Sequence, residues 1–207
     1  MHITPEPTVH IIDYGLGNIG SIANMIRKMG GQPVVCRDPA NLIAAERIIL
    51  PGVGAFDAGM SALENAGFVP PLLDAVTRQV PLLGICLGMQ LLFPASEEGE
   101  RPGLDLIRGR IRRFDPAVGL KVPHMGWNRV EPATSCSLFA GLEDNRFYFV
   151  HSYYADCERA QDVAGTTVYG QPFASAVQVG KVFGAQFHPE KSHKFGMRLV
   201  ANFLGVH

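Results

Sequence analysis

Short apolar runs alternate with amphipathic stretches through the first half of the chain. The apolar residues of segment 19–29 stand at positions 19, 22, 23, 25, 26 and 29, a spacing that predicts a helix. Further helices are expected over 55–65 and 70–78, and strands over 9–13, 33–37, 47–50 and 80–83. Near-continuous apolar strands that alternate with helices predict a doubly wound, mostly parallel sheet flanked by helices, that is, an α/β fold.

The second half of the chain has strand-like runs in succession, with turns between them. These runs are 106–114, 128–131, 146–154, 166–168, 174–179 and 181–187, and a helix is expected from about 194 to 204. Consecutive strands joined by turns predict an antiparallel annex to the parallel sheet. With no internal repeat or linker in view, we expect a single domain over 9–207, after a loose extension over 1–8.

Length and charge narrow the class of protein. A chain of 207 residues is long enough to bury one substantial core. Its formal net charge of −1 gives no electrostatic reason to expect nucleic acid or an anionic membrane as a partner. No run approaches the roughly 18 apolar residues of a membrane helix, and the first residues lack the features of a signal peptide. We therefore expect a soluble protein of the cytoplasm.

The cysteines and histidines do not suggest a metal site. The four cysteines are far apart and form no C-x-x-C pair, which disfavours both zinc and a redox dithiol; they are Cys36, Cys86, Cys136 and Cys157. The two closest histidines, His188 and His193, have no accompanying cluster of cysteine or carboxylate ligands. We expect no metal and no cofactor.

Cys86 lies where an apolar run ends, and a glycine stands two residues to each side of it. A strand that turns abruptly into a helix needs small residues beside the turn, so this spacing predicts a nucleophile elbow with sulfur as the nucleophile. At a helix N-terminus, unpaired N–H groups and the helix dipole favour the thiolate. The alternative is a buried structural cysteine, because free cysteine is among the most buried residue types.

His188 and Glu190 stand at the end of the last strand-like run. Side chains two apart on an extended segment point the same way, so the imidazole and the carboxylate are expected on one face. A carboxylate that holds an imidazole facing a thiol can activate the sulfur and later protonate a leaving group. The alternative is a histidine that caps a strand beside a solvated glutamate. A cysteine, a histidine and a glutamate that all lie at predicted strand ends favour the catalytic interpretation.

These two segments together resemble the class I (triad) glutamine amidotransferase family: Gly84-Ile85-Cys86-Leu87-Gly88-Met89-Gln90 and Gln186-Phe187-His188-Pro189-Glu190. Three more segments make the chain similar to the glutaminase subunits of imidazole glycerol phosphate synthase in histidine biosynthesis. They are Asp13-Tyr14-Gly15-Leu16-Gly17-Asn18, Pro51-Gly52-Val53-Gly54-Ala55-Phe56 and His124-Met125-Gly126-Trp127-Asn128. The similarity runs from about Val9 to the C-terminus in unbroken order.

The resemblance implies that Cys86 attacks the side-chain amide of glutamine and forms a γ-glutamyl thioester. His188 would then protonate the departing ammonia while Glu190 orients the imidazole. The oxyanion would be held by the backbone N–H groups of Leu87 and Val53, and the loss of one such donor can cost roughly 10²–10³ in rate. The alternative at 52–54 is a plain strand-to-helix turn, where glycine is the default residue.

The resemblance also places glutamine specificity on six residues, namely Gly52, Gln90, Glu98, His151, Ser152 and Tyr153. They would hold the α-amino and α-carboxyl groups of the substrate. Two of these assignments have open alternatives. Glu98 precedes a glycine, as acidic residues in solvated turns often do, and His151 could be a core histidine that satisfies a backbone carbonyl.

No phosphate-binding loop or dinucleotide fingerprint is found, and we expect no synthase domain beside the domain at 9–207. The resemblance implies a (β/α)₈-barrel cyclase as partner, which forms a heterodimer with the glutaminase and uses its ammonia. Trp127 is the candidate interface anchor, with a core tryptophan as the alternative, and Lys191 is a second candidate. Rival hypotheses are a glutaminase of another pathway, such as anthranilate or pyridoxal phosphate synthesis, and a catalytically silent binding module on the same fold.

Overall fold

The computed structural model describes residues 6–116, 119–133 and 136–205. Five parallel strands form one side of its main sheet, in the order β2-β1-β3-β4-β12. Their bounds are β1 (Thr8–Ile12), β2 (Gln32–Cys36), β3 (Ile48–Leu50), β4 (Leu82–Ile85) and β12 (Val182–Ala185). The parallel arrangement agrees with the alternation of apolar runs and helices in the first half of the sequence.

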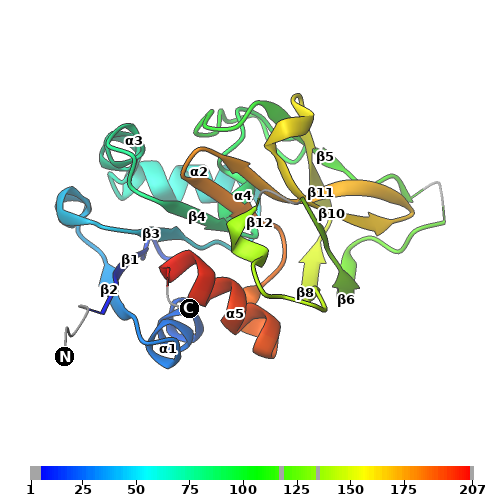
Figure 1. Cartoon of the computed structure of the whole chain (residues 1–207). Coiled ribbons are helices and arrows are strands. Elements are labelled where there is room, and N and C mark those ends of the chain that lie inside the picture. The colour runs from blue at the N-terminus through cyan, green and yellow to red at the C-terminus, as the bar shows by residue number, and fades with distance from the viewer. Residues whose placement is uncertain (1–5, 117–118, 134–135, 206–207) are drawn as a thin grey trace.

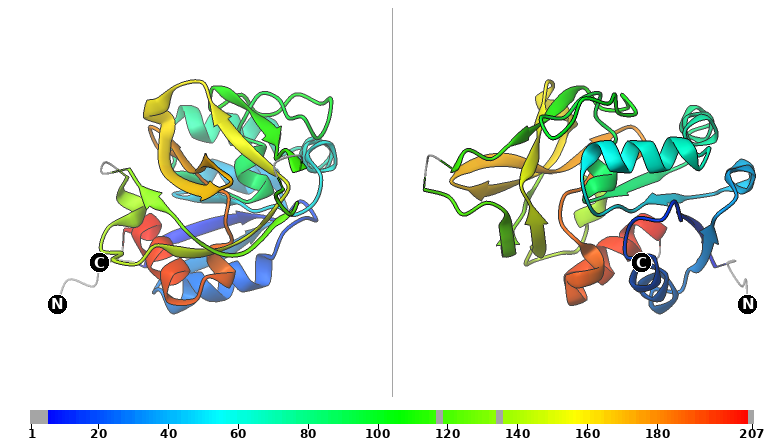
Figure 2. Two further views of the ribbon diagram at one scale, coloured as in Figure 1. Left: turned by 90° about the vertical axis from the view of Figure 1, so that its right-hand side faces the viewer. Right: turned by 180° about the vertical axis from the view of Figure 1, so that it is seen from behind.

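Helices cover both faces of this parallel part, as Figures 1 and 2 show from three sides. One face carries α1 (Ile19–Lys28) and α5 (His193–Leu204), and the other carries α2 (Phe56–Asn65), α3 (Val69–Thr77) and the short α4 (Leu87–Gln90). Neighbouring strand residues point to opposite faces and enter different cores. Ile49 packs with α1 and α5, whereas Ile48 packs with α2 and α3. The parallel strands are therefore buried on both sides, which explains their continuous apolar character.

Antiparallel strands extend the sheet beyond β12. They are β11 (Gln171–Val179), β10 (Val163–Tyr169) and β7 (Glu131–Pro132), with β9 (Tyr153–Cys157) paired to β11 and β5 (Gly109–Arg113) paired to β9. A separate two-stranded sheet is formed by β6 (His124–Arg129) and β8 (Arg146–His151). The antiparallel annex is present as expected, but its strands belong to two sheets.

The boundaries in this second half differ from the sequence prediction. The expected run 146–154 divides into β8 and β9, because the chain leaves the small sheet at Ser152 and joins the main one. The expected run 106–114 begins as a strand only at Gly109, since the N–H groups of Leu106 and Ile107 donate to the carbonyl of Leu92 instead of to a neighbouring strand. The expected run 128–131 corresponds to the end of β6 and to β7.

Residues 1–5 of the expected loose extension lie outside the described residues. The part that follows is attached to the sheet, because the carbonyl of Pro7 accepts a hydrogen bond from the N–H of Gln32 at 3.0 Å. Thr8 already belongs to β1. No helix in the described part of the chain has the length and apolar character needed to span a bilayer.

Candidate active site

Cys86 is the single residue between the end of β4 and the start of α4. Its backbone has φ 54° and ψ −111°, a left-handed conformation that costs energy for any residue with a side chain. The strain is held in place because the N–H of Cys86 donates to the carbonyl of Ala185 at 2.8 Å, and its carbonyl accepts from Met89 and Gln90. The sharp turn is the predicted elbow, and it places the thiol at the N-terminus of α4.

The elbow is packed tightly against β3, and glycine makes this possible. A Cβ atom added to Gly88 would lie 1.9 Å from the carbonyl oxygen of Leu50, which is far inside contact distance. The backbone of α4 therefore approaches the end of β3 as closely as only glycine allows.

His188 reaches Cys86 because β12 is the parallel neighbour of β4. Ile85 is in register with Ala185, so both chains leave the sheet at the same edge. The N–H of His188 donates to the carbonyl of Tyr148 at 2.9 Å, which fixes the segment after β12 against β8. Adjacent parallel strands thus bring together two residues that are about 100 positions apart in sequence, at the carboxyl edge where open α/β sheets bind ligands.

Glu190 orients the imidazole. His188 Nδ1 and Glu190 Oε1 are 2.8 Å apart, and both side chains are almost fully buried. Burial alone would lower the pKa of His188, but its interactions with Cys86 and Glu190 raise that pKa to about 9. The other ring nitrogen, Nε2, makes no hydrogen bond of ordinary geometry to the described residues. The imidazole is therefore held through one ring nitrogen, and the other is available to a ligand in the cavity.

The thiol and the imidazole open into a cavity of about 310 Å³. Its wall is formed by Val53, Gly54, Cys86, Leu87, Gln90, Glu98, Pro123, Val150, His151, Ser152, Tyr153 and His188. Most of the residues expected to bind glutamine or the oxyanion are thus in one place. Pro123 and Val150 were not expected. Pro123 could have been noted as the neighbour of the His124 motif, whereas a valine inside a strand gives no signal.

Gln90 presents a carbonyl oxygen to the cavity. Its Nε2 donates to the carbonyl of Tyr153 at 3.2 Å and to Oε1 of Gln186 at 3.0 Å. Because both amide protons are used in this way, Oε1 is the atom left for a ligand. An acceptor at this position suits a cationic group such as an α-ammonium.

Glu98 lies in a partly buried turn and borders the cavity. Its Oε2 accepts a hydrogen bond from the N–H of Phe56, the first residue of α2, at 2.9 Å. Burial raises the pKa of Glu98, and the charge of Asp57 raises it further, although the hydrogen bond from Phe56 opposes this change. The carboxylate thus caps α2 and faces the cavity at the same time.

His151 is buried, and both of its ring nitrogens are bonded to protein. Nδ1 is 2.7 Å from the carbonyl of Tyr153, and Nε2 is 2.9 Å from Nδ1 of His124, whose Nε2 is 3.2 Å from the amide nitrogen of Asn128. Burial lowers the pKa of His151 to about 3 and that of His124 to about 4, so both rings are neutral near pH 7. The His151 side chain therefore supports the wall of the cavity, which agrees with the alternative of a histidine that satisfies a carbonyl.

The segment after β3 crosses the elbow. A Cβ added to Gly52 would lie 2.9 Å from the nitrogen of Gly88, and Gly54 has a φ of +111°. Val53 is 43% exposed and borders the cavity. The hydroxyl of Tyr14 donates to the carbonyl of Pro51 at 2.7 Å and so anchors the start of this segment. Burial, and then the charge of Cys86, raise the pKa of Tyr14, which keeps the hydroxyl protonated.

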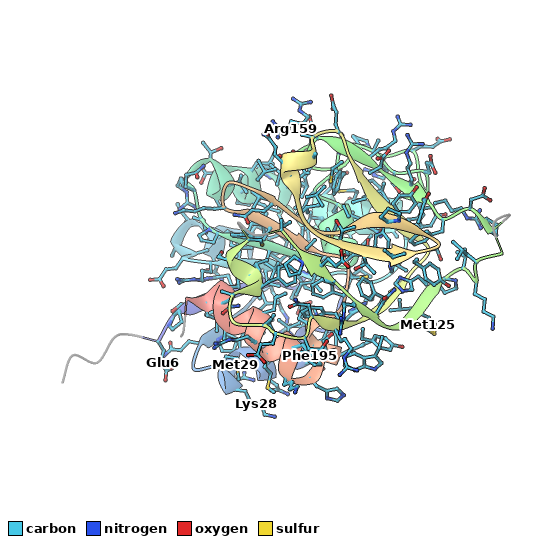
Figure 3. The ribbon with its side chains drawn as sticks, turned by 45° about the vertical axis from the view of Figure 1, so that its right-hand side comes forward. Glu6, Lys28, Met29, Met125, Arg159 and Phe195 are labelled. Carbon is cyan, nitrogen blue, oxygen red and sulfur yellow. The ribbon has the colours of Figure 1, made fainter. Side chains whose placement is uncertain are left out.

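Trp127 and Lys191 lie outside this cavity. Trp127 is 47% exposed, so it is not a core tryptophan, and its ring stacks on His193 with centroids 5.5 Å apart. The ammonium of Lys191 lies 5.7 Å from the centroid of the Tyr148 ring. Met125, on the same exposed side of β6 as Trp127, is 62% exposed and is labelled in Figure 3. Together Met125, Trp127, Lys191 and His193 form a surface that we call the β6 face.

Comparison with known proteins decides the family. The model of the glutamine amidotransferase class-I family matches residues 10–206. The chain belongs to the class-I glutamine amidotransferase family. Among the described residues of this amidotransferase, no group of three histidine, cysteine or carboxylate side chains could hold a metal ion.

Its relatives include "Imidazole glycerol phosphate synthase subunit HisH 2" of Methanococcus maripaludis, which is 48% identical over 95% of this chain and 98% of its own length. The protein of the same name from Pseudomonas aeruginosa is 47% identical over 94% of this chain and 97% of its own length. The expected family is therefore confirmed.

Solved structures confirm the fold. The structure of PurLQS from Thermotoga maritima has a TM-score of 0.75 at 19% identity and covers 97% of this chain and 99% of its own. A glutamine amidotransferase from the same organism has a TM-score of 0.65 at 20% identity, covering 95% of this chain and 82% of its own. Similar backbones at such low identity reflect a shared α/β architecture.

Proposed function

We propose that this amidotransferase is the glutaminase subunit of an imidazole glycerol phosphate synthase and hydrolyses glutamine to glutamate and ammonia. The observation that carries the proposal is the strained elbow of Cys86 beside His188, with Glu190 fixing the imidazole, in the wall of a cavity of about 310 Å³. Near-full-length relatives at 47–48% identity that bear the HisH name support the choice of pathway.

The reaction follows from these positions. The Cys86 thiolate attacks the side-chain carbonyl carbon of glutamine, and the N–H groups of Leu87 and Val53 stabilise the oxyanion. Collapse of the tetrahedral intermediate breaks the C–N bond, and the His188 imidazolium gives its proton to the departing nitrogen, which leaves as ammonia. Water, deprotonated by neutral His188, then cleaves the γ-glutamyl thioester and releases glutamate and the thiolate.

The cavity wall orients the substrate. Oε1 of Gln90 and the carboxylate of Glu98 provide acceptors for the α-ammonium group, while Gly52 and the backbone of Ser152 and Tyr153 hold the α-carboxylate. His151 acts indirectly in this scheme, because its ring is bonded to the carbonyl of Tyr153. Amide hydrolysis of this type uses protein groups alone, so we assign no metal and no cofactor.

The ammonia is used by a partner in this proposal. Ammonia released to water would be protonated and diluted, so transfer to an acceptor enzyme docked on the glutaminase would conserve it. We propose a heterodimer with a (β/α)₈-barrel cyclase in the cytoplasm, with the β6 face as the docking surface. Its exposed Trp127 and Met125 have the character of interface anchors.

The test mixes the purified chain with the barrel cyclase and the cyclase substrate and measures glutamate release, for the parent and for Cys86→Ala. We expect turnover in the parent and its loss in the variant. Turnover that survives Cys86→Ala would exclude the proposed nucleophile. A parent without turnover would favour a silent binding module, and selective capture of a different synthase would overturn the choice of pathway.

A further inference from the structure

Gln186 is a fully buried polar residue that the mechanism above does not use. It follows β12 directly, its side chain is 0% exposed, and its backbone N–H donates to the carbonyl of Ser175 at 2.9 Å. Its Nε2 lies 3.9 Å from Sγ of Cys86, within hydrogen-bond reach of a sulfur acceptor. The parallel pairing of β4 with β12 places this amide beside the nucleophile, two residues before His188.

The direction of this hydrogen bond is fixed by its neighbours. The carbonyl of Tyr153 can only accept, so the NH₂ group of Gln90, and not its oxygen, must face it at 3.2 Å. The second proton of that NH₂ group then requires an acceptor, which is Oε1 of Gln186 at 3.0 Å. Gln186 must therefore turn its own NH₂ group towards Cys86, because the reverse orientation of either amide would set two like groups against each other.

A buried N–H donor aimed at a sulfur atom favours the charged form of that sulfur. Hydrogen bonds to ionised groups are about twice as strong as those between neutral groups, and a low-dielectric site increases the difference. The ionisable groups that interact with Cys86 are His188, which follows β12, and Tyr14, which follows β1. Gln186 differs from both because an amide donates at every pH.

We propose that Gln186 is a further catalytic residue, which donates a hydrogen bond to the Cys86 thiolate while Gln90 and the Tyr153 carbonyl hold its amide in the donating orientation. The amide thereby adds a directed donor to the charge interaction between the sulfur and the His188 imidazolium. Gln90 consequently has two roles, because the same NH₂ group that leaves its oxygen for the substrate also fixes Gln186. This inference rests on the proposed function, since it concerns the nucleophile of that reaction.

The test measures alkylation of Cys86 by iodoacetamide in the full chain, with intact-mass analysis and Cys86→Ala to subtract the other cysteines. Alkylation requires thiolate, and its rate is measured at about pH 7 and at about pH 10, where an ordinary cysteine is mostly thiolate without help from a donor. Gln186→Met removes the donor at nearly constant volume. Gln186→Glu keeps the acceptor for Gln90 but places an oxygen against the sulfur. Gln171→Met, which changes an exposed amide bonded to Tyr154 on the same chain, is the matched control.

We expect Gln186→Met to lower the alkylation rate about tenfold at pH 7, with little change at pH 10. Gln186→Glu should lower the rate at pH 7 further. Gln171→Met should match the parent at both pH values. Parental rates at pH 7 in both Gln186 variants would overturn the proposal. An equal loss at both pH values would also overturn it, because it would indicate altered access or packing. Alkylation needs no glutamine turnover, so a parent that releases no glutamate would refute the proposed function and leave this result interpretable.

Discussion

The parallel and antiparallel halves of the sheet make different contributions to the candidate site: the first positions chemical groups, and the second forms part of the cavity wall. The parallel strands β3, β4 and β12 end together and position the proposed reacting groups, the strained Cys86 and the adjacent His188, through backbone geometry. The antiparallel half delivers the wall, through the His151 to Tyr153 segment between β8 and β9. Changes in the parallel half should therefore affect kcat and stability, and changes in the antiparallel half should affect substrate affinity.

Glu190→Gln should have the largest effect, because it removes the charge that orients His188 and stabilises its imidazolium. By analogy with amide substitutions in other triads, we expect kcat to fall roughly 10³–10⁴-fold with a small change in KM. Steady-state glutamate release in the complex with the cyclase measures this. Glu158→Gln, at an exposed position of the antiparallel half, is the control and should retain the parental kcat. A Glu190→Gln variant with a kcat close to the parent would remove Glu190 from the catalytic machinery.

Gly88→Ala tests whether close backbone contact in the parallel half holds the elbow. The added Cβ would overlap the carbonyl of Leu50, so either β3 or α4 must move. We expect the free energy of unfolding to fall by about 3 kcal/mol, together with loss of turnover. Gly20→Ala is the matched control, because a Cβ at this helical position meets nothing within 4 Å. In urea denaturation, the Gly20→Ala variant should be at least as stable as the parent. A Gly88→Ala variant as stable as the parent would contradict the packing argument.

The raised pKa of His188 predicts a pH-dependent stability. The folded protein holds this proton up to about pH 9, whereas an unfolded histidine releases it near 6.5. The stabilisation is therefore complete below the unfolded value and is lost as the pH rises through about 9, with a maximum of about 3 kcal/mol. The free energies of unfolding of the parent and of His188→Gln, measured by urea denaturation, should differ most at about pH 6 and least at about pH 10.

Cys86→Ser provides the internal comparison for this titration. It removes one of the two partners that raise the pKa of His188 and leaves Glu190 in place. We compare the loss in free energy of unfolding caused by His188→Gln in two backgrounds, the parent and Cys86→Ser. This loss should depend on pH less strongly in the Cys86→Ser background. Equal pH dependence in the two backgrounds would show that Cys86 has no influence on the imidazole.

The sequence predicted that Cys86, His188 and Glu190 lie together at strand ends, because each is marked locally. Cys86 stands between two glycines at a strand end, and His188 and Glu190 close another strand, so neither needed knowledge of distant contacts. The pairing of Gln90 with Gln186 has no such mark. It depends on β4 lying beside β12, and this adjacency joins segments about 100 residues apart. Only the three-dimensional structure shows that both amide protons of Gln90 are donated to protein acceptors.

The antiparallel half was predicted less well for a related reason. The run 146–154 is continuously strand-like, with no glycine or proline to mark the change of sheet at Ser152. The division between β8 and β9 comes from tertiary pairing, since β8 pairs with β6 and β9 pairs with β5 and β11. The role of His151 was left open for the same reason, because the ring of His124 that occupies its second nitrogen lies on another strand.

His124→Phe tests the part of the antiparallel half that supports the cavity wall. The ring of His124 stacks on Phe149 with centroids 4.8 Å apart, so phenylalanine preserves the packing but no longer donates to His151. We expect KM for glutamine to rise about tenfold, with kcat nearly unchanged. His124→Gln, which can donate again, should recover part of the affinity. Glu158→Gln, at an exposed position outside the cavity wall, should change neither constant. A fall in kcat at constant KM would place His124 with the reacting groups instead.

The smallest effect distinguishes two tyrosines, one in each half, whose hydroxyls both donate to a backbone carbonyl. Tyr14 bonds to Pro51 at 2.7 Å beside the segment proposed to bind the oxyanion, whereas Tyr169 of β10 bonds to Lys121 at 2.6 Å. Each phenylalanine variant should lose about 1 kcal/mol of stability or less. Only Tyr14→Phe should lower kcat, by a few-fold, because only there does the freed carbonyl begin the segment that contains Val53. Equal kcat values in the two variants would show that the Tyr14 hydroxyl does not fix the oxyanion donors.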